Sequence, residues 1–368
     1  MNGLEAQRRL AMREIISMTT KRVCGLDLGD KTSALCVCGR GGEIEWEGRV
    51  RTTVAGLAKR FKGVEPMRIA LETGMHSPWV SRQLRQWGHE VIVANASKVR
   101  LIGNSRRKND RLDARTLADL ASVRPRLLSP VEHLSAEAQA HRGVLRSREA
   151  LVRSRSSLIL HARGLVKALG GRLPSCSAES FSKKARGFVP AQLLPALAPI
   201  LSMVGELTAQ IRAYDRQIEE LLRTHYPQAQ RLRQVRGVGP ITALAYVLAL
   251  GDPQRFAKSR TVGAYFGLVP AQRDSGSLRP QLRISKQGDT YVRKLLVQCA
   301  HYILGPHGVD SDLRRLGERL GQAGGKNGKK RAVVAVARKL AVLLHRLLVS
   351  GQPYEPLLQA DLAQPQAA

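Results

Sequence analysis

The fold is decided by the stretch RVCGLDLGDKTSALCVCGRGGEIEWEGRVR, residues 22–51 of the 368-residue chain. Residues 22–28 are mostly apolar, which is typical of a short buried strand. A Gly-Asp-Lys turn separates them from a second strand-like run at residues 33–38. Three glycines then lead to residues 44–51, whose apolar and polar residues alternate. The stretch therefore predicts three consecutive strands joined by short turns.

Helices alternate with strands after this stretch. We expect a short helix at residues 54–62 and a fourth strand at residues 67–71. Residues 77–87 suit a helix that Ser77 caps, and residues 90–94 suit a fifth strand. Three strands followed by alternating helices and strands predict a mixed sheet of the α/β ribonuclease-H-like type. A fold of this kind does not by itself specify a function.

Four carboxylates occupy positions where this fold can gather them. Asp27 ends the first strand just before Gly29, and Glu72 directly follows the fourth strand. Asp110 and Asp113 begin the helical segment DRLDARTLADLASV, and their spacing places both on one helical face. Such a group cannot stay buried and ionised without cations, and oxygen ligands suit Mg²⁺ or Mn²⁺. The pattern predicts a metal site for phosphodiester chemistry.

Each acid also has an ordinary explanation when it is taken singly. An Asp before a Gly is common in turns, a Glu at a strand end can face solvent, and acids at a helix start are favoured by the helix dipole. Two other acids are rivals for the site. We expect Asp30 to face away in its turn and Asp119 to lie on another face of its helix. The order of the four acids, in a chain poor in acidic residues, favours the metal site.

The charge of the chain points to a polyanionic partner. There are 60 Lys and Arg residues against 29 Asp and Glu, which gives a formal net charge of +31. A folded chain with that charge repels itself unless a polyanion neutralises it, and nucleic acid is the first candidate. A basic surface that only confers solubility is the alternative. A membrane anchor would concentrate the charge beside an apolar helix, whereas here it is spread along the whole chain.

The apolar and cysteine content favours a cytoplasmic protein without a membrane partner. The longest apolar run, residues 241–250, is too short to span a bilayer. The first twenty residues carry charges throughout and lack the apolar centre of a signal peptide. Five cysteines fit a reducing compartment. Cys36 and Cys38 form a CxC pair without a second pair, so we interpret them as strand residues rather than zinc ligands.

Basic residues surround two candidate sites. Those flanking the Asp110 segment and those around residues 273–293 would hold a phosphate backbone beside the chemistry, although a solvated basic loop is an equally simple explanation. The predicted nucleic-acid contacts are Lys98, Arg100, Arg106, Arg107, Lys108, Arg111, Arg273, Arg283, Lys286 and Arg293.

Ser275 lies within this second basic region, in the loop sequence RDSGS. A Ser-Gly step exposes the hydroxyl and lets backbone approach a substrate, but a nucleophilic serine also needs cations to hold the phosphate. Ser-Gly steps are common in turns, so the residues alone favour an ordinary turn.

The rest of the chain predicts helices. Residues 134–225 are largely helical, and residues 170–199, which are rich in Gly, Pro and Ser, interrupt them; the heptads are too irregular to settle whether the arms form a coiled coil. At residues 231–240 the sequence RLRQVRGVGP favours either a helix-hairpin-helix or a plain helix start at Pro240. We divide the chain into an extension (1–21), an α/β domain (22–130), a helical linker (131–230), a mainly helical domain (231–350) and a flexible tail (351–368).

Four motifs together resemble one known family. GLDLGDKTS, ALETG, KNDRLDARTLA, and FGLVPAQRDSGS with ISKQGDTYVRKLL are similar to the insertion-sequence 110 family of transposases over roughly residues 23–303. The resemblance implies a RuvC-like domain with a DEDD acid set at Asp27, Glu72, Asp110 and Asp113. It also implies a helical linker and a carboxy-terminal transposase domain whose catalytic serine falls on Ser275, with Ser277 as an alternative.

The resemblance implies a mechanism as well. The serine attacks a DNA phosphate to form a covalent phosphoserine link, metal ions at the acid site assist, and the two halves of the site can come from different protomers of a dimer or tetramer. A bridge RNA encoded by the element pairs with donor and target DNA. Two alternatives stay open: a structure-specific nuclease of the RuvC type that uses the acids alone, and a non-catalytic nucleic-acid-binding protein. The extension of about twenty residues before the first strand departs from the family pattern.

Overall fold

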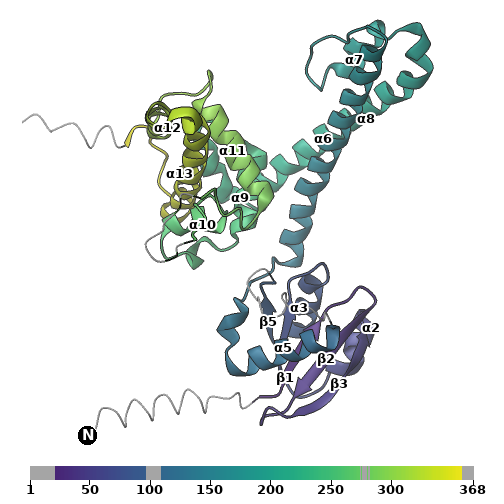
Figure 1. Cartoon of the computed structure of the whole chain (residues 1–368), viewed down its shortest axis with the longest axis vertical. Helices are drawn as coiled ribbons and strands as arrows, with labels where there is room; N and C mark the ends of the chain where they lie inside the picture. Colours follow the sequence, from purple (N-terminus) through teal and green to yellow (C-terminus); the bar gives the residue numbers. More distant parts are fainter. Residues whose placement is uncertain (1–20, 97–108, 274, 276–279, 281, 359–368) are drawn as a thin grey trace, which may run out of the picture. The chain divides into compact units, whose positions relative to one another are not determined.

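The computed structural model describes residues 21–96, 109–273, 275, 280 and 282–358. They fall into two compact units, Met1–Ala136 and Glu137–Ala368. The first unit contains the sheet, and the second is mainly helical (Figure 1). The expected α/β amino-terminal part and mainly helical carboxy-terminal part are thereby confirmed.

The first unit is built on a five-stranded sheet with the strand order β3-β2-β1-β4-β5. β1, β2 and β3 form an antiparallel meander, whereas β4 is parallel to β1 and β5 is parallel to β4. Every strand expected from the sequence is present within one residue at each end, and the mixed sheet is confirmed. The strands are β1 Val23–Asp27, β2 Thr32–Cys38, β3 Ile44–Arg51, β4 Arg68–Glu72 and β5 Glu90–Ala94.

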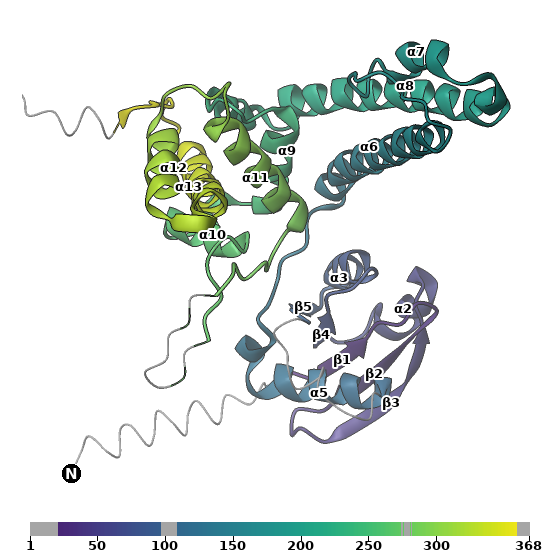
Figure 2. The same ribbon diagram turned by 45° about the horizontal axis from the view of Figure 1, so that its top comes forward.

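Helices cover both faces of this sheet (Figure 2). α5 (Asp110–Val123) packs on one face, and α2 (Val54–Phe61) and α3 (Ser77–Gln86) pack on the other. The capping role expected of Ser77 is wrong, because His76 is the N-cap residue and makes no side-chain cap. The Ser77 hydroxyl instead donates to the carbonyl oxygen of Gly74 at 2.8 Å, so it closes the preceding turn rather than the helix.

Two long helices begin the second unit, α6 (Ala136–Ala168) and α8 (Leu194–Thr224). They are antiparallel, since Arg148 pairs with Asp215 while Arg155, two turns further along α6, bonds Thr208. The short helix α7 (Phe181–Ala185) lies at the far end of the pair (Figure 1).

The expected interruption at residues 170–199 is shorter than predicted, because α8 begins before Pro199. A proline inside a helix removes one backbone hydrogen bond. Burial of Leu197, Leu201 and Val204 against α6 and α7 offsets this loss. By length and composition alone, the stretch Ala191–Thr224 could cross a membrane; this is weak evidence, because buried core helices pass the same test.

The carboxy-terminal helices share one core with the near ends of α6 and α8, through residues such as Leu145 and Ile218. Residues of the segment expected as a linker therefore contribute to the core of the carboxy-terminal helices. The helices are α9 Pro240–Leu250, α10 Val262–Tyr265, α11 Thr290–Leu304, α12 Asp312–Ala323 and α13 Gly328–Ser350. Short 3₁₀ turns lie between helices along the chain. η1 Pro125–Leu128 follows α5, η2 Arg186–Phe188 and η3 Ala191–Leu193 lie between α7 and α8, and η4 Pro227–Gln234 lies between α8 and α9. η5 Pro253–Arg255 and η6 Ser259–Thr261 lie between α9 and α10, and η7 Gly325–Asn327 lies between α12 and α13.

The glycine-rich turn before α9 resolves one of the open alternatives. α9 begins at Pro240 with Gly239 as its N-cap residue, as the plain helix start requires. The element before it is the 3₁₀ stretch η4, not an α-helix. Gly237 has a φ of 94°, and a side chain there would collide with the ring of Tyr302. The turn therefore packs against the protein, which argues against a hairpin of two α-helices.

Candidate functional site: an acidic row and a serine loop

The strand register brings Asp27 and Glu72 together. Leu26 of β1 pairs with Leu71 of β4, so the next residues, Asp27 and Glu72, lie side by side at the ends of two parallel strands. The neighbours of this pair on β2 and β5 are Ala34 and Ala94. Small residues therefore flank the two carboxylates on both sides. We call Asp27, Glu72 and Asp113 the acidic row.

Asp113 approaches the same face of the sheet from above. Residues two apart on a strand share a face, so Asp27 lies on the face of Gly25, and α5 covers that face. A Cβ at Gly25 would collide with the carbonyl oxygen of Ala114, the residue directly after Asp113. This close approach of helix to strand places Asp113, which is only 8% exposed, over the ends of β1 and β4.

Asp110 lies one turn earlier on α5 and is exposed. Its carboxylate accepts a hydrogen bond of 3.3 Å from Arg49 of β3. Arg49 pairs with Ala34, which in turn pairs with Asp27, so Asp110 stands at the β3 end of the same line across the sheet. The structure thus places three of the predicted acids on one face at the ends of β1 and β4, and the fourth at the solvent edge.

Glu47 was not expected from the sequence, yet it anchors the helix that carries two of the acids. Its carboxylate accepts hydrogen bonds from Arg115 and Arg111, and its side chain is only 10% exposed. These hydrogen bonds lower the pKa of Glu47 to about 2, and the bond from Arg115 contributes most. The sole hint in the sequence is that Glu47 belongs to the same strand face as Arg49. Asn109 caps the helix by accepting a hydrogen bond from the backbone N–H of Arg111.

The rival acids lie elsewhere. The Asp30 side chain is 91% exposed and pairs with His76 at 3.4 Å. The negative charge of Asp119 raises the pKa of Cys38, although burial contributes more. Because Cys38 pairs with Val23 at the start of β1, Asp119 lies at the opposite end of the sheet from Asp27. Neither acid joins the acidic row.

The donor set of the row fits a hard divalent cation. Asp27, Glu72 and Asp113 offer only carboxylate oxygens, and two of them are adjacent on parallel strands. Oxygen ligands of this kind are preferred by Mg²⁺ and Mn²⁺. Adjacent carboxylates that share a site favour a bound cation, because otherwise their mutual repulsion opposes ionisation. The residues present therefore suit the divalent metal that the sequence resemblance implies.

Cys36 and Cys38 are buried strand residues, as expected. Both lie in β2 on the face covered by α5, with their sulfur atoms 4.0 Å apart. Burial, the main cause, raises the pKa of Cys36 to about 12. Burial thus keeps the free thiol protonated at neutral pH.

Ser275 belongs to the segment 267–289, which we call the serine loop and whose two ends pair as a short two-stranded stem. Pro270 bridges Ile284, and the backbone N–H of Ala271 donates to the carbonyl oxygen of Arg283 at 2.9 Å. Ser275 itself is exposed beyond this stem. Its alternative, Ser277, lies outside the described residues.

Two glycines and an arginine hold the base of the stem. Gly267 and Gly288 have φ of 66° and 74°, and a Cβ at either would collide with backbone of the opposite segment, at Gln287 and Tyr265 respectively. Arg293 of α11 crosses this point and donates to the carbonyl oxygens of Phe266 at 3.0 Å and Gln287 at 2.7 Å. Only glycine allows the two segments to approach so closely.

Comparison with known proteins identifies the chain. A family model described as "Transposase IS116/IS110/IS902 family" matches residues 229–308, and a model of the DEDD type, described as "Transposase", matches residues 24–170. A protein of Pseudomonas aeruginosa named "Probable family 20 transposase" is 32% identical over 306 residues, which are 80% of this chain and 88% of the relative. The chain belongs to the IS116/IS110/IS902 family of transposases.

Further relatives extend the likeness over nearly the whole transposase. The "Transposase for insertion sequence element IS1111A" of Coxiella burnetii is 28% identical over 362 residues, 95% of this chain and 93% of the relative. The "Transposase for insertion sequence element IS1328" of Yersinia enterocolitica is 31% identical over 258 residues, 66% and 75% of the two chains. The resemblance to this family is confirmed.

Nine of the ten predicted nucleic-acid contacts of the transposase divide into three groups. Arg273, Arg283 and Lys286 are exposed on the stem of the serine loop. Arg111 is exposed but already pairs with Glu47. The remaining basic residues of the amino-terminal flank, Lys98, Arg100, Arg106, Arg107 and Lys108, lie outside the described residues.

Arg293 requires a correction. Its side chain was expected to contact nucleic acid, but the residue is only 8% exposed and its guanidinium binds backbone carbonyls at the stem. A guanidinium whose donors are occupied inside the protein is not available to phosphate. In this transposase Arg293 is a structural residue of the serine loop.

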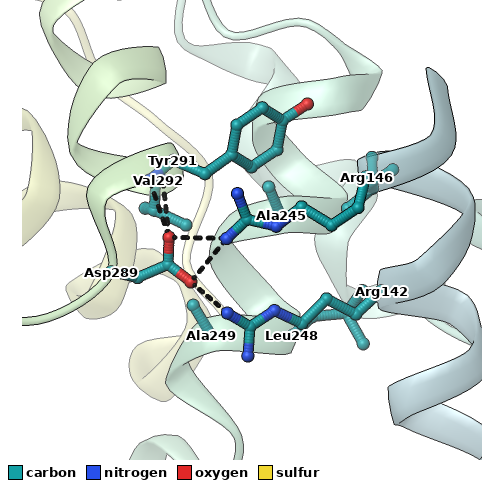
Figure 3. Close-up of a pocket in the computed structure, with 9 residues that line it drawn as sticks. Arg142, Arg146, Ala245, Leu248, Ala249, Asp289, Tyr291 and Val292 are labelled. Carbon is teal, nitrogen blue, oxygen red and sulfur yellow. Dashed lines mark hydrogen bonds and ion pairs between the residues drawn. The ribbon is translucent and has the colours of Figure 1, made fainter. Parts of the chain in front are cut away.

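Asp289 links the same loop to α6. Its carboxylate caps α11 by accepting from the backbone N–H of Tyr291, and it pairs with Arg142 at 2.9 Å and Arg146 at 3.3 Å (Figure 3). The Arg146 guanidinium also lies over the ring of Tyr291. The long helix of the transposase is thereby tied to the residue that ends the serine loop.

Proposed function

We propose that this transposase cuts and rejoins DNA strands with the Ser275 hydroxyl as nucleophile and with Asp27, Glu72, Asp110 and Asp113 holding Mg²⁺ or Mn²⁺. The observation that carries the proposal is the convergence of three acids on the sheet face beneath α5. Family membership supports phosphodiester chemistry on DNA as the purpose of that convergence.

The serine step is a transesterification. The Ser275 oxygen attacks the phosphorus of a DNA phosphodiester, the bond from phosphorus to one DNA oxygen breaks, and that oxygen leaves as a hydroxyl with the proton that serine gives up. The phosphoserine link keeps the free energy of the broken bond, so the reverse attack by a DNA hydroxyl rejoins the strands. Arg273, Arg283 and Lys286 are the exposed cations on the stem that would hold the phosphate.

The acids act through what they bind. When bound there, Mg²⁺ or Mn²⁺ polarises a phosphoryl oxygen and stabilises the leaving oxygen. Asp27 and Glu72 supply two adjacent ligands from the rigid sheet, and Asp113 supplies one from α5. Asp110 is the exposed member and already pairs with Arg49, so its place is the edge of the site.

The partners follow from charge and family. We propose donor and target DNA as substrates and a bridge RNA as the guide that selects them; the net charge of +31 suits several nucleic-acid strands at once. We also propose a homo-dimer or tetramer, because strand exchange acts on two duplexes. Its place would be the cytoplasm, at the bacterial nucleoid.

One alternative has an observation in its favour. The acidic row is held entirely by sheet register and α5, so it can act as a RuvC-type metal-dependent endonuclease without any serine. Under that alternative, hydrolysis leaves no protein–DNA link. The two functions therefore differ in their product.

The test is to trap the covalent product. Labelled DNA spanning the ends of the element that encodes the transposase, with its target DNA and flanking non-coding RNA, is incubated with Mg²⁺ and resolved under denaturing conditions. Wild type should give a protein–DNA adduct. Ser275→Ala should abolish the adduct, whereas the matched variant Ser277→Ala should keep it. Cleavage by Ser275→Ala at the wild-type rate would replace the proposal with the nuclease.

A further inference from the structure

A second group of metal-binding side chains lies in the other unit, at the base of the two long helices. Glu137, His141 and His225 each offer one ligand atom, and these atoms all lie within 4.8 Å of one another. This group shares no residue with the acidic row. It differs in kind as well, since two of its three donors are imidazole nitrogens.

The fold places the three side chains together through regular structure. Glu137 and His141 are four residues apart in the first turns of α6, so they share one helical face. His225 is the C-cap residue of α8. Because α6 and α8 are antiparallel, the start of one helix meets the end of the other. The Nδ1 atom of His225 is 3.1 Å from a carboxylate oxygen of Glu137, and the rings of His141 and His225 have centroids 4.7 Å apart.

Tyr226 orients the imidazole of His141 through a hydrogen bond. Its hydroxyl hydrogen-bonds the Nδ1 atom of His141 at 2.9 Å, and the two rings meet edge to face. A histidine that binds a metal ordinarily uses its other ring nitrogen in such a bond, which fixes the tautomer and the ring orientation. In the tautomer whose Nδ1–H donates to the Tyr226 oxygen, the Nε2 atom of His141 carries the lone pair for coordination.

We propose that Glu137, His141 and His225 form a zinc site. Two imidazoles and a carboxylate are a preferred Zn²⁺ donor set, with bonds of about 2.0–2.2 Å that put ligand atoms roughly 3.3–3.5 Å apart. The separation of 3.1 Å between Glu137 and His225 is slightly shorter than this spacing, and the limit of 4.8 Å for the group requires only small side-chain rotations. Three protein ligands leave the fourth position for water.

Two classes of metal are thereby separated within one chain. Imidazole nitrogen favours zinc and its neighbours over Mg²⁺, while the all-oxygen acidic row favours Mg²⁺. The strongly positive chain opposes any cation, but Glu137 and the nearby Glu220 of α8 provide local negative charge, the latter shared with Arg223 at 2.6 Å. The proposal stands whether or not Ser275 is the nucleophile.

The bound ion would close the base of the helical pair. It would join the first turns of α6 to the residue that ends α8, and the next residue of α6 after His141 is Arg142, which pairs with Asp289. We therefore place the zinc site where it fixes the helix that also holds the end of the serine loop. Its role is structural support of that joint.

The experiment measures Co²⁺ and Zn²⁺ binding by the full-length protein, purified without a polyhistidine tag and stripped of metal with a chelator. All variants carry Asp27→Asn, and the buffer contains excess Mg²⁺. The acidic row therefore does not contribute to the measured Co²⁺ and Zn²⁺ binding. We expect one equivalent of Co²⁺ per chain, with the visible absorption of a tetrahedral site that Zn²⁺ then displaces. Addition of Zn²⁺ should raise the melting temperature.

Four variants give the proposal its controls. His141→Ala and His225→Ala should remove the Co²⁺ absorption and the thermal shift, while His161→Ala, an exposed histidine elsewhere on α6, should change neither. Tyr226→Phe keeps all three ligands and should weaken Zn²⁺ binding about 10-fold. Circular dichroism without metal verifies that the variants fold. Wild-type Co²⁺ spectra in His141→Ala and His225→Ala, or the absence of a tetrahedral spectrum in the parent protein, would overturn the site.

Discussion

Asp27 and Glu72 lie at the ends of neighbouring parallel strands, whereas Ser275 follows one side of a short two-stranded stem. The acids are positioned by the repeating geometry of sheet and helix. The serine loop is positioned by single contacts, in which Gly267, Gly288 and Arg293 allow two backbone segments to cross.

This difference shows how each region can be disrupted. A regular element unfolds only when its packing is lost, because many equivalent backbone hydrogen bonds hold it together. A stem held by one arginine and two glycines is displaced when one of these contacts is lost. The following changes test whether the acidic row is the more robust region and whether the two regions fail independently.

The largest effect is expected from Asp27→Asn, which removes a charged ligand from the centre of the acidic row. Mg²⁺-dependent strand cleavage should fall on the order of 10³-fold, because a neutral amide would hold a divalent cation more weakly than a carboxylate does. Cleavage of labelled element-end DNA measures it. Asp30→Asn is the control and should retain wild-type cleavage, since Asp30 lies in solvent beside His76. Equal activity of wild type and Asp27→Asn would remove the row from catalysis.

Gly25→Ala should separate α5 from the sheet, because the new methyl group would collide with the Ala114 carbonyl oxygen. We expect the first unit to lose about 3 kcal/mol of unfolding free energy, the upper part of the usual range for overpacking. Urea unfolding followed by circular dichroism measures it. Gly74→Ala, at a site with open space around it, should have little effect. An unchanged unfolding curve for Gly25→Ala would contradict the close helix–strand contact.

Gly288→Ala tests the serine loop without touching the first unit. Its φ of 74° and the clash with the Tyr265 carbonyl oxygen should displace the stem. Since misplacing a reacting group by about 1 Å can reduce its rate some 10²-fold, we expect a loss of that order in covalent adduct. Metal binding by the acidic row should be unchanged. Gly239→Ala serves as the control within the same unit, because the added Cβ would meet no neighbouring atom. Normal adduct formation by Gly288→Ala would mean that the stem does not position the serine.

The smallest effect concerns Glu47 and pH. Hydrogen bonds from Arg115 and Arg111 lower its pKa from 4.5 to about 2 in the folded protein. The stabilisation is therefore complete above about pH 4.5 and is lost as the pH falls towards 2. Glu47→Gln should melt at a lower temperature than wild type at pH 7, and the difference should shrink below pH 4. Glu65→Gln, from an exposed pair with Arg40, should show no such pH dependence. A constant difference at every pH would exclude this role.

The strands were predictable because local patterns decide them. Alternation and apolar runs placed every strand within one residue, and α5 begins at Asp110 as expected. The start of α8 could not be predicted, because Pro199 favours a break in the helix. Only the burial of Leu197, Leu201 and Val204 against α6 and α7 offsets the effect of the proline. The burial of Arg293 could not be predicted either. Its partners are backbone carbonyls, which do not depend on residue type.

The sequence by itself determined the acids, their order and the α/β class, since strand and helix periods are properties of neighbouring residues. Tertiary structure alone decided which acids meet: the β1–β4 register pairs Asp27 with Glu72, and the Gly25 contact brings Asp113 over them. It alone joined Glu47 to Arg111 and Arg115, and Glu137 to His225. Contacts between residues far apart in the chain depend on packing, and packing is fixed only when the whole core has formed.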